Sequence, residues 1–163
     1  MTQENKELLL KDICARLPYG IRCAGWLNIT SDKDVDKVYP WVDGELMDGI
    51  TDSQVRIQGT WIKIEFVRPY LRPMTSMTDK EKKDLLNYVV GKGSKYFEVC
   101  DDVSITDKSS DEQDVKSFEL KWINFNPNTT SRYIEWLLKN HFDFCNLIPK
   151  SLALPAPEGM YKI

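Results

Sequence analysis

The chain has 163 residues, of which 42% are hydrophobic and 29% are charged, and its net charge is −3. This length suits one domain spanning residues 1–163 and excludes a (β/α)8 barrel, which needs roughly 200 residues or more. No apolar run approaches the roughly 20 residues of a membrane-spanning helix, and the polar segment 1–7 is not typical of a signal peptide. We therefore expect a cytoplasmic protein that makes no membrane contact.

The first element is predicted to be a helix over residues 2–17. Leu9 and Ile13 recur within it at helical spacing, together with neighbouring leucines. Thr2 is a suitable N-cap, and Pro18 ends the helix because the residue before a proline is pushed out of helical geometry.

The next segments favour strands. Residues 21–29 are rich in β-favouring side chains, and two Asp-Gly pairs within 38–50 predict a short strand, a turn and a second short strand. Residues 54–67 alternate between apolar and polar, and the alternation switches parity near Gly59, which indicates a tight turn or a bulge between two strands. These strands suffice for a small, curved antiparallel sheet of the SH3-like or partial-barrel kind.

A proline-containing segment, residues 68–73, follows, and its two prolines are expected to prevent regular strand pairing. A capping box that begins at Thr78 then predicts a helix over residues 78–90, which the following glycines end. The single domain can accordingly be subdivided into a helix with a small barrel, residues 1–75, and a remainder, residues 76–163.

The remainder is predicted to contain two strands, a helix and a tail. Residues 96–105 and 115–125 favour strands around an acidic loop, and residues 126–128 favour a turn. The periodicity of residues 131–141 predicts the last helix, and residues 142–163 carry three prolines and predict an extended tail that packs over the surface. The expected fold is therefore α+β, with an N-terminal helix, a small sheet and two further helices.

No metal or cofactor is expected from the motifs. Residues 32–36 alternate aspartate as a calcium loop does, but Lys37 stands where such a loop needs glycine, so a solvated acidic loop is the better interpretation. Residues 91–94 are glycine-rich but follow a helix, whereas a phosphate-binding loop precedes one. The cysteines form no C-x-x-C pair and are interpreted as reduced packing residues; they are Cys14, Cys23, Cys100 and Cys145.

Catalysis is constrained by the presence of a single histidine, His141. Asp143 is a candidate for orienting it, and Cys145 is a candidate nucleophile four residues away. This arrangement defines one alternative function, an enzyme with an acidic or Cys–His site. We favour a packing or capping role for His141, because it follows the apolar face of the last helix, and we therefore assign no catalytic residue.

The segment 68–73 is the strongest candidate for a binding surface. Two arginines flank a tyrosine on a backbone that two prolines stiffen, so little entropy is lost when it engages a partner. Together with tryptophans of the neighbouring sheet, such side chains can grip a peptide or stack on bases. The structural alternative is that the aromatic residue packs under the next helix while the arginines are solvated. The candidate binding residues are Arg68, Tyr70, Arg72, Trp26 and Trp41, with Trp61 nearby.

A second alternative function is nucleic-acid binding. Residues 54–95 contain nine bases and four acids, although the whole chain is acidic. A basic segment attracts phosphate, but in an acidic protein it more often pairs with acidic loops of the same chain or faces solvent.

Three blocks of sequence resemble one family. Leu17-Pro18-Tyr19-Gly20, residues 67–78 (VRPYLRPMTSMT) and the blocks NHFD and APEGMY within residues 140–161 resemble small proteins encoded by gut Bacteroides-type bacteria and by their phages or mobile elements. The resemblance implies a setting inside a bacterial host and supplies no catalytic residue. Together with the residue chemistry, it leads us to expect a non-catalytic interaction module that binds a host or phage protein.

Overall fold

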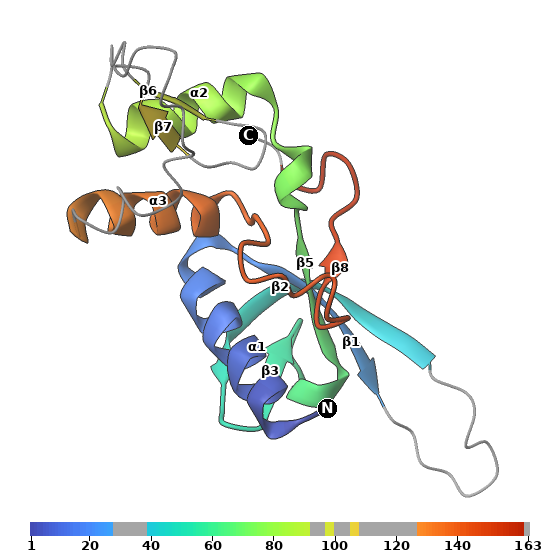
Figure 1. The fold of residues 1–163 in the computed structure, drawn as a ribbon. Helices are drawn as coiled ribbons and strands as arrows, with labels where there is room; N and C mark the ends of the chain where they lie inside the picture. Colours follow the sequence, from blue (N-terminus) through green and yellow to red (C-terminus); the bar gives the residue numbers. More distant parts are fainter. Residues whose placement is uncertain (28–38, 92–96, 100–104, 108–126, 162–163) are drawn as a thin grey trace, which may run out of the picture. The chain divides into compact units, whose positions relative to one another are not determined.

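The computed structural model describes residues 1–27, 39–91, 97–99, 105–107 and 127–161 (Figure 1). The chain divides into two compact units, which we describe separately. Unit 1 consists of Met1–Arg72 and Asp143–Ile163, and unit 2 consists of Pro73–Phe142. The expected α+β class is confirmed, since the chain begins with a helix, has further helices and forms two small, mostly antiparallel sheets.

Unit 1 begins with helix α1, Gln3–Arg16. The Thr2 hydroxyl caps it by accepting a backbone hydrogen bond from the first turn, as predicted. The helix ends in a short 3-10 turn, Leu17–Tyr19, which contains the proline that the sequence suggested as a stop. Leu9 and Ile13 are fully buried, so this helix contributes one wall of the core.

Four antiparallel strands follow in a meander: β1, Arg22–Leu27; β2, Tyr39–Ile50; β3, Gln54–Ile57; and β4, Thr60–Lys63. Between β3 and β4 the chain turns on two residues, Gln58 and Gly59, which both have positive φ, 47° and 83°. This is a type I′ hairpin turn, whose twist matches that of the flanking strands. The predicted parity switch near Gly59 is thereby confirmed.

The prediction of two short strands within residues 38–50 is wrong, because β2 is continuous. The glycines of β2 allow side chains of neighbouring strands to approach closely and do not form the predicted turns. A methyl group at Gly44 would collide with the side chain of Gln58, and one at Gly49 would come within 2.8 Å of Trp61 Cη2. Glycine in a strand often marks such a close approach.

The sheet is completed by β5, Val67–Leu71, and β8, Leu154–Pro155. After β4 a 3-10 turn, Ile64–Phe66, leads into β5, which returns to pair with β1. The strand order is β4-β3-β2-β1-β5-β8, and only the β5–β8 pair is parallel. A segment near the C-terminus therefore joins the sheet that the N-terminal segments build.

The expectation that two prolines prevent pairing in residues 68–73 is wrong, since Pro69 lies within β5 opposite Cys23. The Leu71 carbonyl faces β8, where it accepts a hydrogen bond from the Ala156 N–H at 2.8 Å. Alternate residues of a strand face the same side, so the missing N–H of Pro69 also lies on the β8 side. The register with β8 begins only at Tyr70, and the proline therefore costs the β1–β5 ladder no hydrogen bond.

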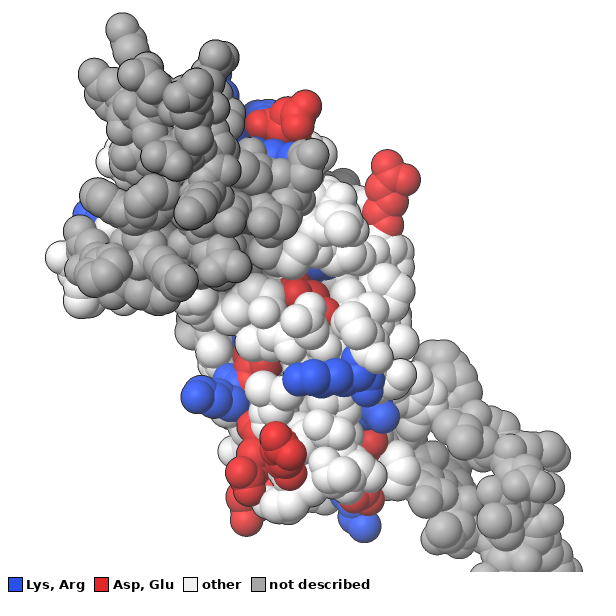
Figure 2. Space-filling view, viewed as in Figure 1, with Lys and Arg blue, Asp and Glu red and all other residues white. Residues whose placement is uncertain are grey.

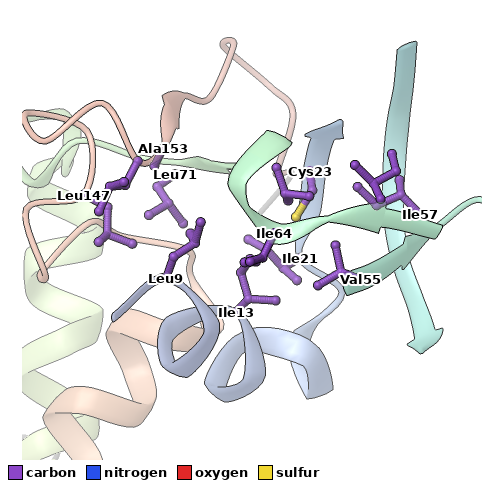
Figure 3. Close-up of a cluster of buried hydrophobic side chains, with 13 residues drawn as sticks. Leu9, Ile13, Ile21, Cys23, Val55, Ile57, Ile64, Leu71, Leu147 and Ala153 are labelled. Atoms are coloured by element: carbon purple, nitrogen blue, oxygen red, sulfur yellow. The ribbon is translucent and has the colours of Figure 1, made fainter. Parts of the chain in front are cut away.

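The core of unit 1 lies between α1, the strands and the C-terminal segment (Figure 3). Figure 3 shows Leu71, Leu147 and Ala153 grouped beside Leu9, at the opposite end of the cluster from Ile57. The prediction that residues 142–163 form a tail over the surface is therefore wrong. Single apolar residues of this segment point into the core at irregular spacing, so no sequence pattern predicts their burial.

Unit 2 contains helix α2, Asp79–Val89, and helix α3, Pro127–Lys139, which contact each other. The capping box predicted for α2 is confirmed: the Thr78 hydroxyl accepts from the backbone N–H of Glu81, whose carboxylate accepts in turn from the N–H of Thr78. A short 3-10 turn, Met74–Ser76, precedes this helix.

Two details of unit 2 differ from expectation. Residues 96–105 were predicted to form one strand, but the described part forms two short antiparallel strands, β6, Phe97–Val99, and β7, Ile105–Asp107. Helix α3 begins at Pro127, where a turn was predicted, because proline fits the first helical position, whose N–H has no partner within the helix. The strand predicted over residues 115–125 lies outside the described residues.

Candidate functional site

Arg68, the first predicted binding residue, is held by the fold. Its Nε donates to the Ser151 carbonyl at 2.7 Å, and its Nη1 donates to the carbonyls of Glu65 and Val67 at 3.0 and 2.7 Å. Burial lowers the pKa of the guanidinium below its usual value. The side chain thus fastens the turn at residue 151 to the start of β5, and these contacts are made by Nε and Nη1, two of the three nitrogens of the guanidinium.

Tyr70 and Arg72 are half-buried, and their main chains also stabilise unit 1. The Tyr70 carbonyl accepts a hydrogen bond from the Tyr161 hydroxyl at 2.8 Å, and the Arg72 carbonyl accepts one from the Asp143 N–H at the same distance. Leu71 between them is fully buried in the core of this unit. Residues 68–71 therefore belong to β5, an internal strand of the sheet, and Arg72 directly follows its end.

The two predicted tryptophans lie on neighbouring strands. Trp26 is half-buried on β1, and its register partner on β2 is Pro40. The preceding residue, Gly25, pairs with Val42, so Trp41 is the extra residue of a β-bulge. The bulge brings the backbones of Trp26 and Trp41 to adjacent positions of the sheet.

His141 belongs to the end of α3. Its N–H donates to the Leu138 carbonyl, the Phe142 N–H donates to the Leu137 carbonyl at 3.0 Å, and its φ is +57°. This is a Schellman motif with histidine at the left-handed position. The Phe142 ring stacks on Trp136 with centroids 5.7 Å apart, and the imidazole is buried. This geometry supports the capping interpretation.

Asp143 belongs to unit 1, where its buried carboxylate organises the next turn. One oxygen accepts from the Leu147 N–H at 2.7 Å and the other from the Ile148 N–H at 2.8 Å. Burial, followed by the negative charge of Asp12, raises the pKa of the Cys145 thiol, so the thiol stays protonated at neutral pH and is a poor nucleophile. The backbone contacts of the Asp143 carboxylate and the raised pKa of Cys145 both argue against an enzyme with a Cys–His site.

A surface that the sequence analysis did not define, although it named Trp61 beside the binding candidates, lies on the outward face of β3 and β4. Trp61 is 45% exposed, and its register partner across the hairpin is Arg56, which is also exposed. The indole lies over Gly49 of β2, which leaves room for it because it has no side chain. Val55 and Ile62 alternate with these residues and are buried, so the hairpin has one core face and one exposed face.

The signal for this face was present in the predicted parity switch. A two-residue turn places Ile57 and Thr60 on the same face of the hairpin, so the next residue, Trp61, must face outward. Hydrophobicity alone would have assigned the tryptophan to the core. We define Arg56, Trp61 and Lys63, which are all exposed, as the hairpin face.

The charged side chains of the described surface do not form one basic patch in the view of Figure 2, where acidic and basic groups are interspersed. The bases of residues 54–95 that the structure describes are divided between the two units: Arg56, Lys63, Arg68 and Arg72 lie in unit 1, and Lys80, Lys82 and Lys83 lie in unit 2. Neither unit by itself therefore carries the whole described set of bases.

No protein-family model, curated protein or solved structure matches this chain. Within the described ranges, no group of three histidine, cysteine, aspartate or glutamate side chains is placed to hold a metal ion. None of the helices in those ranges has the length and apolar character needed to cross a membrane. The hairpin face of unit 1 is therefore the candidate that the geometry supports best.

Proposed function

We propose that this protein is a non-catalytic interaction module and that unit 1 binds a partner protein through the hairpin face. The observation that carries the proposal is the exposed indole of Trp61, seated directly across the hairpin from Arg56. Tryptophan and arginine are the residues most enriched among those that dominate binding energy at protein interfaces. Unit 1 presents both of them on one rigid hairpin.

The support beneath the indole favours binding. The ring packs on Gly49 and beside Arg56 Cβ, and the hairpin that carries it is closed by a type I′ turn. A side chain that is already held loses less rotamer freedom when a partner covers it. The indole is thus already positioned for contact, whereas Arg68 lies on an internal strand of the sheet and its guanidinium donates to three main-chain carbonyls.

The resemblance to proteins of Bacteroides-type bacteria and their phages or mobile elements suggests where the partner is found. On this proposal, the module acts in the bacterial cytoplasm and its partner is a host or phage protein. The cytoplasm of a Bacteroides-type host is accordingly the source of material for a test.

The test is affinity capture from host lysate with three matched baits: the wild-type chain, Trp61→Ala and Tyr88→Ala. Tyr88 is the control because it is an exposed aromatic residue, 39% accessible, on α2 in unit 2. We expect a protein that is retained by the wild type and by Tyr88→Ala but not by Trp61→Ala, with equal urea midpoints for all three baits. Retention that is equal for all three would overturn the proposal.

The same capture separates the nucleic-acid alternative. Nuclease treatment should leave the retained protein in place if the contact is protein to protein. Nucleic acid that is retained at roughly 50 mM salt and lost at roughly 200 mM salt would instead support that alternative. Binding through several phosphate contacts weakens roughly thousandfold over this range of salt.

A further inference from the structure

Strand β4 is an edge of the six-stranded sheet. It pairs with β3 on one side, and among the described residues no strand pairs with its other side. An edge strand presents unpaired main-chain N–H and C=O groups, which form a template for another strand. The residues of this edge, Trp61 and Lys63, are the ones that carry the hairpin face.

The register fixes which groups point outward. In a two-residue hairpin the residues that close the turn, Ile57 and Thr60, form a hydrogen-bonded pair, so the next pair, Arg56 and Trp61, does not. The N–H and C=O of Trp61 therefore face away from β3. Lys63 shares this orientation by alternation, and its N–H also faces the open edge. Consistently, the Ile64 N–H points back and donates to the Ser53 carbonyl at 2.9 Å.

The exposed side chains on the outward face of β3 and β4 favour a negatively charged partner. Arg56 and Lys63 flank the Trp61 indole on the exposed face, and all three are exposed. The nearest acids along the chain, Asp52 and Glu65, lie beyond the ends of the two strands. A strand laid beside β4 would thus lie next to Trp61 and Lys63 on this face, with Arg56 one strand further into the sheet.

We propose that an acidic, extended segment of the partner adds to the sheet as a strand beside β4. Its main chain bonds to Trp61 and to the N–H of Lys63, its carboxylates lie near Arg56 and Lys63, and an apolar side chain rests on the indole. This inference rests on the proposed function and adds the mode of docking and the chemistry of the partner. Strand addition derives affinity from the main chain and specificity from alternate side chains.

A second copy of this chain is a poorer occupant of the same edge. Two copies paired through β4 would bring Arg56 and Lys63 of both chains onto one sheet face, and like charges on neighbouring strands are destabilising. A lysine on an edge strand can instead prevent other strands from pairing with that edge, which is the alternative role for Lys63. These two readings give different outcomes in the experiment below.

The sharpest test compares two variants of one residue. Lys63 has φ −62°, which proline adopts without strain, and the residue before it is in a strand, as proline requires. Lys63→Pro therefore removes the outward N–H together with the charge, whereas Lys63→Ala removes only the charge. The difference between the two variants measures the main-chain hydrogen bond.

The probe is a fluorescent nine-residue peptide that alternates glutamate and valine, titrated against the full chain by fluorescence anisotropy. We expect it to bind at least about tenfold more tightly than its lysine-for-glutamate counterpart. Trp61→Ala should weaken binding about tenfold or more, and Lys63→Pro should weaken it about fivefold relative to Lys63→Ala, as one lost hydrogen bond predicts. If Lys63→Pro does not fold, a glutamate–valine probe N-methylated at every amide takes its place and should not bind.

Four results would overturn the inference. They are no binding of the glutamate–valine probe, equal binding of its lysine counterpart, equal affinity of Lys63→Pro and Lys63→Ala, and a sedimenting dimer that Lys63→Pro abolishes. If lysate capture still depends on Trp61 while the two Lys63 variants capture equally, strand addition is wrong and the proposed function stands. If capture does not depend on Trp61, both are wrong.

Discussion

The hydroxyl of Tyr161 occupies a place where two strands would otherwise bond directly. It accepts from the Arg22 N–H at 3.2 Å and donates to the Tyr70 carbonyl at 2.8 Å. The β1–β5 register ends at Cys23 opposite Pro69, so Arg22 and Tyr70 are the next pair of the ladder. One phenolic oxygen therefore continues the pairing of β1 with β5 and binds the C-terminal segment to both strands.

We predict that Tyr161→Phe destabilises the protein by about 2 kcal/mol at pH 7. The substitution keeps the ring and removes two hydrogen bonds, each of which contributes about 1 kcal/mol net in proteins. Urea unfolding followed by circular dichroism measures the difference, and an unchanged m-value would show that the folded and unfolded states remain comparable. A difference below about 0.5 kcal/mol would refute the bridging role.

The pH dependence gives an independent check of sign. Burial raises the pKa of Tyr161 above its usual value of 10.0, so the folded state retains the proton after the unfolded state has lost it. The stability linked to this group is therefore present in full below about pH 10 and is lost as the pH rises. The advantage of the wild type over Tyr161→Phe should shrink above pH 10 by up to about 1.4 kcal/mol per pH unit. An advantage that grows with alkaline pH would show that the reasoning is wrong.

Three further substitutions test the packing and the caps by urea unfolding. Gly25→Ala should cost about 1–3 kcal/mol, because the new methyl group would collide with Ile62 Cδ1 in the core; an unchanged midpoint would mean that the core relaxes freely. Asp143→Ala should cost about 2–4 kcal/mol through loss of its two charge-assisted bonds to backbone N–H groups, with peptide affinity unchanged below the unfolding transition; a loss of affinity without a loss of stability would give it a functional role. Thr78→Ala should cost about 1 kcal/mol, the usual contribution of an N-cap, and Thr78→Ser should restore most of it.

The elements that the sequence predicts well are those whose determinants are local. Helices α1 and α2 begin at Thr2 and Thr78, whose capping partners lie three residues away. The β3–β4 hairpin likewise follows from alternation around a two-residue turn. In each case the residues that determine the element lie within a short stretch of the chain, so the sequence alone is enough to predict it.

The features that the sequence does not reveal depend on distant partners. Pro69 is tolerated within β5 because its missing N–H faces the β8 side, where pairing with residues 154–155 begins only at Tyr70. The sequence alone suggests a solvated cation at Arg68, yet its Nε donates to a carbonyl 83 positions away. The partners of the predicted binding segment within unit 1 thus lie far along the chain, beyond any local window of sequence.

The candidate site shows the same division. The outward position of Trp61 follows from local alternation, but the support beneath its ring comes from Gly49 on another strand. In sequence, that glycine indicates a turn. Its actual role requires knowledge that β2 continues through it and that an indole crosses above it.

The point at which unit 2 leaves and rejoins unit 1 yields a final prediction. The Asp143 N–H donates to the Arg72 carbonyl at 2.8 Å, so the chain departs and returns at neighbouring positions. The buried cluster that contains Leu9, Leu71 and Leu147 draws only on residues of unit 1, including those of the returning segment. Chains are tolerant of insertion where the two ends lie together at a surface.

Unit 2 thus has the connectivity of an insertion into unit 1, and unit 1 should fold without it. We predict that Met1–Arg72 joined to Asp143–Ile163 by about two glycines, enough to span the roughly 5 Å between hydrogen-bonded strand positions, unfolds cooperatively in urea. It should also bind the glutamate–valine probe within about twofold of the full chain, since the hairpin face lies wholly in unit 1. A matched variant that ends at Arg72 lacks Leu147 and Tyr161 and should not unfold cooperatively. If the joined chain also lacks a cooperative transition, unit 2 is required for folding and the insertion interpretation is wrong.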